Sequence, residues 1–331
     1  MEAFKPIELA QPRDFSKKMN ATIEFIRQNF KAIFKCLLYI AGPPVLLSSI
    51  LIGNFYGDYM GFISRGPQSI ESMEEMQNYF LSAGFWLQIL GAAVFGFVAG
   101  ALTLAVIYNY ILEYDEKKTN QIEVNDVWIR VRKTIGMYMG TMILYGIALV
   151  VLYFIIIIPM FLLAMLQSIA LMFIGGIGVV CIFMYVWISL SLVFIIRAYE
   201  KVGFFSAVSR SFYLIKGKWW STFGVVFVTS FVQSTISSLF LIPWYIGFVV
   251  KMMHTVQNKA FEEPSLMEQL VNDAFFVLYF FASFVFYVIP LVGISFQYFN
   301  LVELKESRGL MAKIDTLGQA PAETTPSDED F

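Results

Sequence analysis

The residues of this sequence best suited to bind a charged ligand lie in one basic stretch between two apolar runs. The stretch is RAYEKVGFFSAVSRSFYLIKGKWW, residues 197–220. Five of its side chains are candidates for contact with a lipid or a partner: Glu200, Arg210, Lys216, Trp219 and Trp220. Arg210 and Lys216 could bind a phosphate or a lipid headgroup, with Glu200 paired to Arg210. The alternative is that the stretch only anchors the chain to the membrane surface.

A stripe of polar side chains in the apolar run 219–250 is the second candidate. Thr229, Gln233 and Ser237 recur every four residues, so they share one face of a helix. With a neighbouring serine and a glutamine from the last apolar run, the stripe consists of Thr229, Gln233, Ser234, Ser237 and Gln297. Polar groups at membrane depth face protein or water. The stripe therefore predicts either hydrogen bonds between helices or the wall of a hydrated cavity.

The sequence offers little for catalysis or for metal binding. The single histidine and the two cysteines do not form a cluster, whereas a typical zinc site needs three or four convergent ligands. The middle of each apolar run lacks the ionisable residues that proton-coupled carriers and intramembrane hydrolases usually need. We therefore predict no enzymatic activity, no metal, no cofactor and no binding of nucleic acid.

Membrane-spanning helices must position these candidate residues. The chain is 58% hydrophobic and only 15% charged, whereas soluble domains carry about 25% charged residues. Five stretches lack Asp, Glu, Lys and Arg, and the longest, 134–196, is long enough for two spans of roughly 20 residues each. A turn near 165–170 would divide it. The six predicted spans are about 31–55, 80–112, 135–163, 170–197, 220–250 and 273–302.

The distribution of basic residues predicts the orientation. With six spans, 20 of the 23 Lys and Arg residues fall on one side of the membrane. The positive-inside rule places that side, and both termini, in the cytoplasm. The predicted organisation is an amphipathic cytoplasmic segment (1–30), a first hairpin (31–112), a basic linker with a second hairpin (113–197), an interfacial helix with a third hairpin (198–302), and a cytoplasmic tail (303–331) that is disordered from about 315.

Residues 204–216 are predicted to form an amphipathic helix that lies on the cytoplasmic membrane surface. Their apolar positions recur with helical spacing, and Gly217 follows where a left-handed cap would end the helix. The residues predicted to form the apolar face are Phe204, Val208, Phe212 and Ile215.

The hairpins also resemble one another. With a shift of 84 residues, Gly140 aligns with Gly224 and Pro159 with Pro243. This similarity predicts three parallel copies of one unit, in which a basic segment precedes a span outward and a span back.

The pattern around the candidate residues resembles a motif of a broad bacterial membrane family. It consists of Glu200, Gly203, Ala207, Arg210, Ser211, Leu214, Lys216 and Gly217 between two spans. That family includes the membrane domain attached to some glycerophosphodiester phosphodiesterases and stand-alone relatives of unknown function. The resemblance covers about 195–225 and the six-span topology, and the phosphodiesterase barrel is missing. It therefore implies a membrane module rather than an esterase.

Two functions follow from these patterns. The first is a non-enzymatic module of the bacterial inner membrane that acts as a scaffold, assists a partner or organises lipid, with anionic headgroups as candidate ligands. The second is a transporter or channel for a small or amphipathic solute, lined by the polar stripe. The sequence leaves the oligomeric state and the identity of any protein partner open.

The charge distribution leads to a first testable prediction. Reporter fusions after residues 20, 125, 210 and 315 should report a cytoplasmic location, and fusions after 65 and 260 an external one. A fusion after residue 210 that reports an external location would contradict both the orientation and the number of spans.

Overall fold

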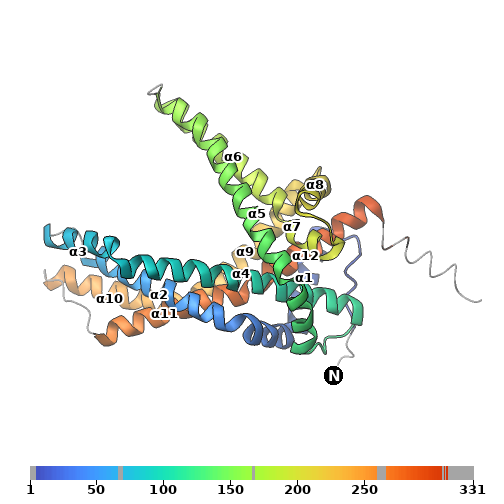
Figure 1. The fold of residues 1–331 in the computed structure, drawn as a ribbon, viewed down its shortest axis with the longest axis horizontal. Helices are drawn as coiled ribbons and strands as arrows, with labels where there is room; N and C mark the ends of the chain where they lie inside the picture. The colour runs from blue at the N-terminus through green and yellow to red at the C-terminus, as the bar shows by residue number, and fades with distance from the viewer. Residues whose placement is uncertain are drawn as a thin grey trace, which may run out of the picture.

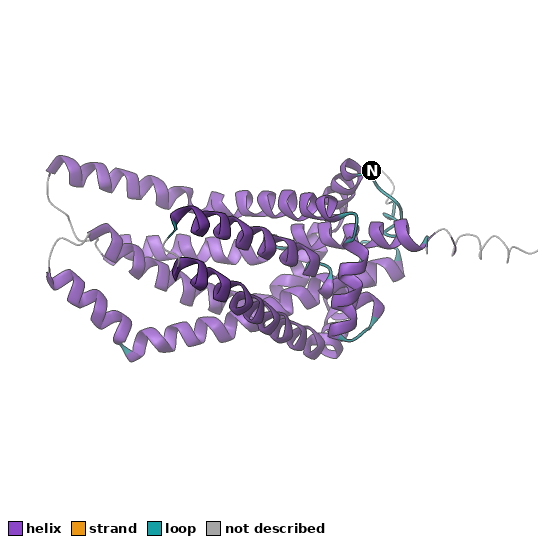
Figure 2. Cartoon of the chain, turned by 90° about the horizontal axis from the view of Figure 1, so that it is seen from above, coloured by secondary structure: helices purple, strands orange, loops and turns teal. Residues whose placement is uncertain are grey.

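A computed structural model of the chain describes residues 5–65, 70–165, 168–258, 266–307, 309 and 311. The described residues form helices and contain no strand (Figure 2). The predicted turn residues 166–167 and the predicted disordered tail lie outside the described residues. The helices are α1 (Phe15–Cys36), α2 (Gly42–Arg65), α3 (Ile70–Leu81), α4 (Ala83–Lys117), α5 (Val124–Met165), α6 (Ile169–Leu190), α7 (Val193–Glu200), α8 (Phe204–Ile215), α9 (Trp219–Ser238), α10 (Ile242–Asn258), α11 (Leu266–Phe286) and α12 (Val288–Glu306).

Six helical segments of the described chain are long and apolar enough to cross a membrane, so the chain is a multi-pass membrane protein. They are Phe15–Tyr59, Ala83–Lys117, Val124–Phe161, Ala170–Glu200, Trp219–Val250 and Leu270–Glu306. The predicted all-α fold with six spans is confirmed. The side of the membrane on which each terminus lies stays a prediction.

The helices divide the chain differently from the predicted units. The expected amphipathic segment 1–30 does not form a helix of its own, because α1 continues into α2 through a π-helical turn, Leu37–Ala41. Likewise, α5 begins at Val124 and includes the second half of the basic linker. The third unit has a separate helix before its span: α8 ends at Ile215, and Gly217 has a φ of 80°, which reverses the chain without the steric penalty that a side chain would bring.

The two aligned prolines occur in different local structures. Pro159 lies inside α5, which continues past it to Met165. Pro243 follows a 3₁₀ turn, Leu239–Leu241, that separates α9 from α10. A proline removes one backbone donor and crowds the preceding turn, and the two helices accommodate this in different ways. The superposition of the three units therefore stays a prediction.

Residues 5–14, the 118–123 loop, α8 and the C-terminal turn of α12 lie at one end of the bundle (Figure 1). We call this end the polar end, because these segments carry charged side chains. From there α2, α4 and α11 run side by side, and α5 and α6 diverge from them (Figure 1). The outer half of α5 exposes apolar side chains along its length, among them Ile143, Ile147, Val150, Phe154 and Ile158. Such a surface suits contact with lipid.

The main hydrophobic core lies in the half of the bundle next to the polar end, and α12 runs through it. Every residue of α12 from Pro290 to Glu303 is buried. Around this helix pack α1, α4, α7, α8, α9 and α11. At Gly293 the side chain of Thr229 approaches so closely that a methyl group at that position would meet it at 2.7 Å. Gly293 therefore allows the close approach of α9 to α12.

The polar side chains of α12 hold the surrounding segments in place. Gln297 accepts a hydrogen bond from the Lys18 ammonium on α1 at 2.6 Å and donates one to Thr222 on α9 at 2.9 Å. The Lys18 ammonium also donates to Ser221 at 2.8 Å. Asn300 accepts the Arg13 backbone amide at 2.6 Å. Because Lys18 is only 2% exposed, its charge depends on these partners.

The buried contact between Lys18 and Gln297 leads to a second prediction. Gln297→Leu should lower the free energy of unfolding by about 1–3 kcal/mol, since the Lys18 ammonium and the Thr222 hydroxyl both lose a buried partner. The double variant Lys18→Met/Gln297→Leu should recover part of that loss, because it removes the unpaired charge as well. Thermal unfolding in detergent measures both effects.

The matched control is Ser234→Ala, at an exposed position of α9, which should change stability by less than about 0.5 kcal/mol. Strict additivity of the two single substitutions in the double variant would contradict the coupling.

Candidate functional site: a basic pocket at the polar end

Arg210, the central residue of the predicted basic site, is held between two carboxylates. Its Nε and Nη2 atoms both donate to the Glu200 Oε1 atom at 3.1 Å, and its Nη1 atom donates to Glu306. The Tyr298 hydroxyl donates to the same Glu200 oxygen at 2.9 Å. Arg210 thus joins the ends of α7 and α12 to α8.

This clamp accounts for the electrostatics of Arg210. Hydrogen bonds with Glu306 and then Glu200 raise the pKa of Arg210 above its ordinary value, against the opposing effect of burial. A guanidinium that faces two carboxylates is already neutralised, so an anionic headgroup would have to compete with both.

The other predicted residues of the basic stretch have separate environments. Lys216 is exposed, and its backbone carbonyl accepts a hydrogen bond from the Lys305 ammonium at 3.2 Å. Trp219 stacks on Tyr185 with ring centroids 5.9 Å apart, and its indole N–H donates to the Tyr185 carbonyl at 3.3 Å. Trp220 is 74% exposed. Lys216 follows α8 and the two tryptophans begin α9, and none of the three is hydrogen-bonded to Arg210 among the described residues.

Helix α8 forms where it was predicted, but its buried face is turned relative to the expected one. Phe204 and Ile215 are buried as predicted, whereas Val208 and Phe212 are only half-buried. The buried positions are Phe204, Ala207, Ser211, Leu214 and Ile215. The reason is that α8 packs on α6, α7 and α12, and the Ser211 hydroxyl donates to the Ser189 carbonyl at 2.5 Å. Protein contacts, and not a membrane alone, set the orientation of this helix.

The polar stripe of α9 does not form one continuous surface. Thr229 and Ser237 are buried, and Gln233 donates to the Ser237 hydroxyl at 3.2 Å and to the Ser283 carbonyl on α11 at 3.4 Å. Ser234 is exposed on another side of α9. Gln297 is buried and bonded to Lys18 and Thr222. These contacts fit hydrogen bonding between helices, the first of the two interpretations of the stripe.

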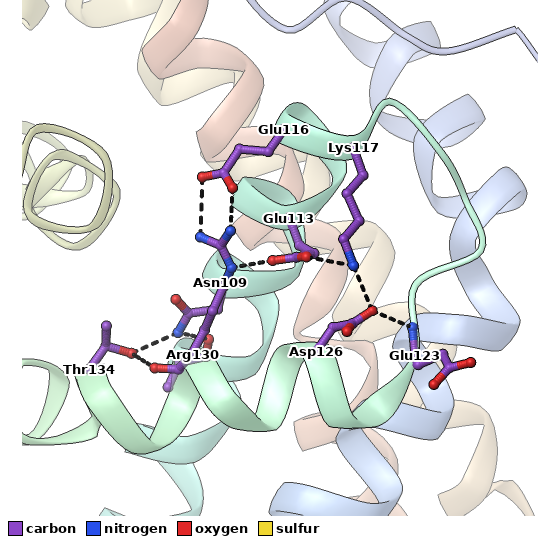
Figure 3. Close-up of polar contacts among 9 residues, drawn as sticks. Asn109, Glu113, Glu116, Lys117, Glu123, Asp126, Arg130 and Thr134 are labelled. Atoms are coloured by element: carbon purple, nitrogen blue, oxygen red, sulfur yellow. Dashed lines mark hydrogen bonds and ion pairs between the residues drawn. The ribbon is translucent and has the colours of Figure 1, made fainter.

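A pocket of about 660 Å³ lies at the polar end, between the end of α4, the start of α5 and the segment from α7 to residue 202. One wall is an ion-pair network between α4 and α5 (Figure 3). Arg130 donates to Glu113 and, through Nη1 at 3.2 Å, to Glu116. The Lys117 ammonium lies 2.9 Å from Glu113 and 2.8 Å from Asp126.

A second set of contacts fixes the register of the two helices. The Asn109 side chain on α4 donates to the Thr134 hydroxyl on α5 at 2.8 Å, and that hydroxyl donates to the Arg130 carbonyl at 2.9 Å (Figure 3). Asn109 also donates to the Ala105 carbonyl of its own helix at 2.8 Å. The ion pairs and this second set of hydrogen bonds, at different positions along α4 and α5, therefore both hold this wall of the pocket together.

Three cations that line the pocket have no carboxylate partner among the described residues. They are Lys133, Arg197 and Lys201. Arg197 is held by uncharged groups: it donates to the Thr141 hydroxyl, to the Met137 carbonyl at 3.5 Å and to the Val202 carbonyl at 3.4 Å. These bonds fix the guanidinium without neutralising its charge.

The pocket is also lined by Tyr138, whose hydroxyl is fully buried and has no hydrogen-bond partner among the described residues. A buried polar group without a partner is unfavourable. Because that hydroxyl is fully buried, a ligand in the pocket cannot reach it, and the three cations without carboxylate partners are the groups that suit the pocket to an anion.

Sequence reasoning missed this pocket, although part of its signal was present. Arg130, Lys133 and Met137 are spaced three and four residues apart and so share one face of α5. Arg197 is the first residue of the basic stretch from which the sequence argument began. Nothing in the spacing along the chain indicates that Arg197 faces Met137, because the two are 60 residues apart.

Comparisons of the chain with protein-family models, with curated proteins and with solved structures find no match. The resemblance of the basic stretch to a bacterial membrane family therefore stays a prediction. Among the described residues, no cluster of three or more His, Cys, Asp and Glu side chains is suited to hold a metal ion.

The Arg210 clamp leads to a third prediction. Arg210→Lys should lower stability by about 1–3 kcal/mol, because a lysine cannot reproduce the fork that reaches two carboxylates. Amide hydrogen exchange should rise in 204–215, while co-purified anionic phospholipid should be unchanged. Ser209→Ala, at an exposed position on α8, is the matched control. Loss of lipid with unchanged exchange would mean that Arg210 holds a headgroup instead.

Proposed function

We propose that this protein is a non-enzymatic module of the bacterial inner membrane that binds anionic lipid through the pocket between α4, α5 and α7. The polar end faces the cytoplasm in this proposal, because most of the Lys and Arg residues fall on that side. The observation that carries the proposal is the convergence of Lys133, Arg197 and Lys201 on one pocket, where none of the three has a carboxylate partner among the described residues.

The chemistry of the lining favours binding over catalysis. Its two carboxylates, Glu113 and Asp126, are both engaged in ion pairs, and neither histidine nor cysteine lines the pocket. General acid–base or nucleophilic catalysis needs a group free to exchange a proton or attack a substrate. The cations, in contrast, are well suited to hold a negative charge in place.

The surroundings of the pocket favour a lipid. Leu112, Ile129, Met137 and Val202 line it beside the charged residues, and the helices that form it continue into apolar spans. A headgroup could meet the cations while its acyl chains follow the apolar surface of the bundle. Basic pockets between spans on the cytoplasmic side are known to bind anionic headgroups.

Transport by the polar stripe is the alternative left by the sequence. The stripe's hydrogen bonds within and between α9, α11 and α12 support a role in helix association. The exposed position of Ser234 also separates it from the other stripe residues. The pocket is therefore the better basis for a function.

The proposal predicts the effect of removing the two exposed lysines of the pocket. Lys133→Gln/Lys201→Gln should weaken binding of anionic lipid by about 2 kcal/mol, roughly thirtyfold, since each basic residue near a charged headgroup contributes about 1 kcal/mol. Binding is measured by native mass spectrometry of the full-length protein with added phosphatidylglycerol or phosphatidic acid, and with phosphatidylcholine as the zwitterionic reference.

The matched control is Lys216→Gln/Lys218→Gln, which removes the same charge from exposed positions at the polar end outside the pocket. This control should retain the lipid affinity of the unaltered chain. An equal loss of lipid affinity in both double variants would mean that the lysines between α8 and α9 also bind the lipid, or that affinity depends only on the total charge of the protein. Either result would contradict a pocket-specific site.

A further inference from the structure

The charges around the pocket of the proposed lipid site do not cancel. The network in its wall contains three carboxylates, Glu113, Glu116 and Asp126, and two cations, Lys117 and Arg130, so it carries one net negative charge. Lys133, Arg197 and Lys201 add three positive charges without partners among the described residues. The region therefore carries two net positive charges. A ligand with two negative charges would neutralise it, whereas a ligand with one would leave a cation unmatched.

The unused hydrogen-bond donors of Arg197 point to the same kind of ligand. Arg197 donates through Nε and Nη1, and no bond within the described residues occupies its Nη2 atom. A guanidinium has five N–H donors in a planar fork. A terminal phosphate presents three acceptor oxygens to such a set, whereas a phosphodiester presents two unesterified oxygens.

We infer that the pocket selects lipids with a terminal phosphomonoester, of the phosphatidic acid type, over phosphodiester lipids such as phosphatidylglycerol. The inference rests on the proposed function, because it specifies the ligand class of the same site. The phosphate meets Arg197, Lys133 and Lys201. The apolar part of the lipid lies along the side of the pocket lined by Ile129 and Met137.

The test is competition at two pH values with the full-length protein in detergent micelles. A fluorescent anionic lipid is displaced by phosphatidic acid, by phosphatidylglycerol or by inorganic phosphate. At pH 8, phosphatidic acid should displace it at about five- to tenfold lower concentration than phosphatidylglycerol, since it carries one more charge. At pH 5.5 this advantage should shrink, because the dianion of a phosphomonoester takes up a proton at about pH 6 and keeps only one negative charge.

The pH effect reports on the ligand because of the groups that face the phosphate. The charged side chains that line the pocket come from three segments: Glu113 from α4, Asp126, Arg130 and Lys133 from α5, and Arg197 and Lys201 from α7 and the segment after it. None is a histidine, the residue type whose charge ordinarily changes between pH 5 and 8. Phosphatidylglycerol, a diester, serves as the internal reference that should change little over the same range.

Lys201→Gln separates binding from folding. The lysine is exposed and has no carboxylate partner among the described residues, so the variant should fold as well as the unaltered chain yet lose severalfold affinity for phosphatidic acid at pH 8. Lys216→Gln, at an exposed position outside the pocket lining, should leave that affinity unchanged. Unchanged affinity in Lys201→Gln would overturn the assignment of this ammonium and with it the proposed phosphate position.

The remaining outcomes distinguish the inference from the proposed function. Equal displacement by phosphatidic acid and phosphatidylglycerol would overturn the selectivity and leave anionic lipid binding intact. Displacement by inorganic phosphate at the same concentration as phosphatidic acid would identify a free phosphate site and overturn the lipid assignment. Failure of all anionic lipids to bind would overturn both proposals.

Discussion

A helix that is buried on every side cannot leave a polar side chain unpaired, and this constraint on α12 organises the polar end. Its buried polar side chains beyond Pro290 are Ser295, Gln297, Asn300 and Glu303. The serine bonds within the helix, but the other three need partners from elsewhere. Gln297 binds Lys18 and Thr222, Asn300 binds the Arg13 amide, and Glu303 accepts the Gly309 amide at 2.7 Å. Hydrogen bonds to one helix thereby bring together α1, α9 and both ends of the described chain.

The helices are hydrogen-bonded to one another near the polar end and diverge further out, and this difference explains where a ligand site can form. Near the polar end, α4 and α5 are joined by Arg130 and by the contact between Asn109 and Thr134. Further out, α5 and α6 diverge from the other spans and expose apolar side chains (Figure 1). The pocket lies near the polar end, where α4 and α5 are still bonded to each other. Its cations are thus presented by helices whose positions are already fixed, which limits the ordering that binding would require.

Features set by local sequence were predictable, and features set by distant contacts were not. Charge-free runs of adequate length were enough to predict the six spans, and helical spacing with Gly217 was enough to predict α8. No local pattern indicates that Glu306 joins Arg210, because the two lie 96 residues apart. Nor does the sequence indicate that Lys18 enters the core: it precedes the first charge-free run, and only the polar residues of α9 and α12 make its burial tolerable. The continuity of α1 and α2 was missed for a different reason, since a π-helical turn has no distinctive residue type.

Arg197 and Arg210 illustrate why residue type alone did not identify the site. Both belong to the same basic stretch, and both were counted as evidence for a cytoplasmic surface. Arg210 faces Glu200 and Glu306, so its charge is neutralised within the protein and its role is to hold helices together. Arg197 is bonded only to a hydroxyl and to backbone carbonyls, so its charge is oriented but not neutralised. An anion that enters the pocket can pair with Arg197, whereas Arg210 already has two carboxylates. The number of carboxylates that the fold brings to each arginine therefore separates a structural clamp from a binding group.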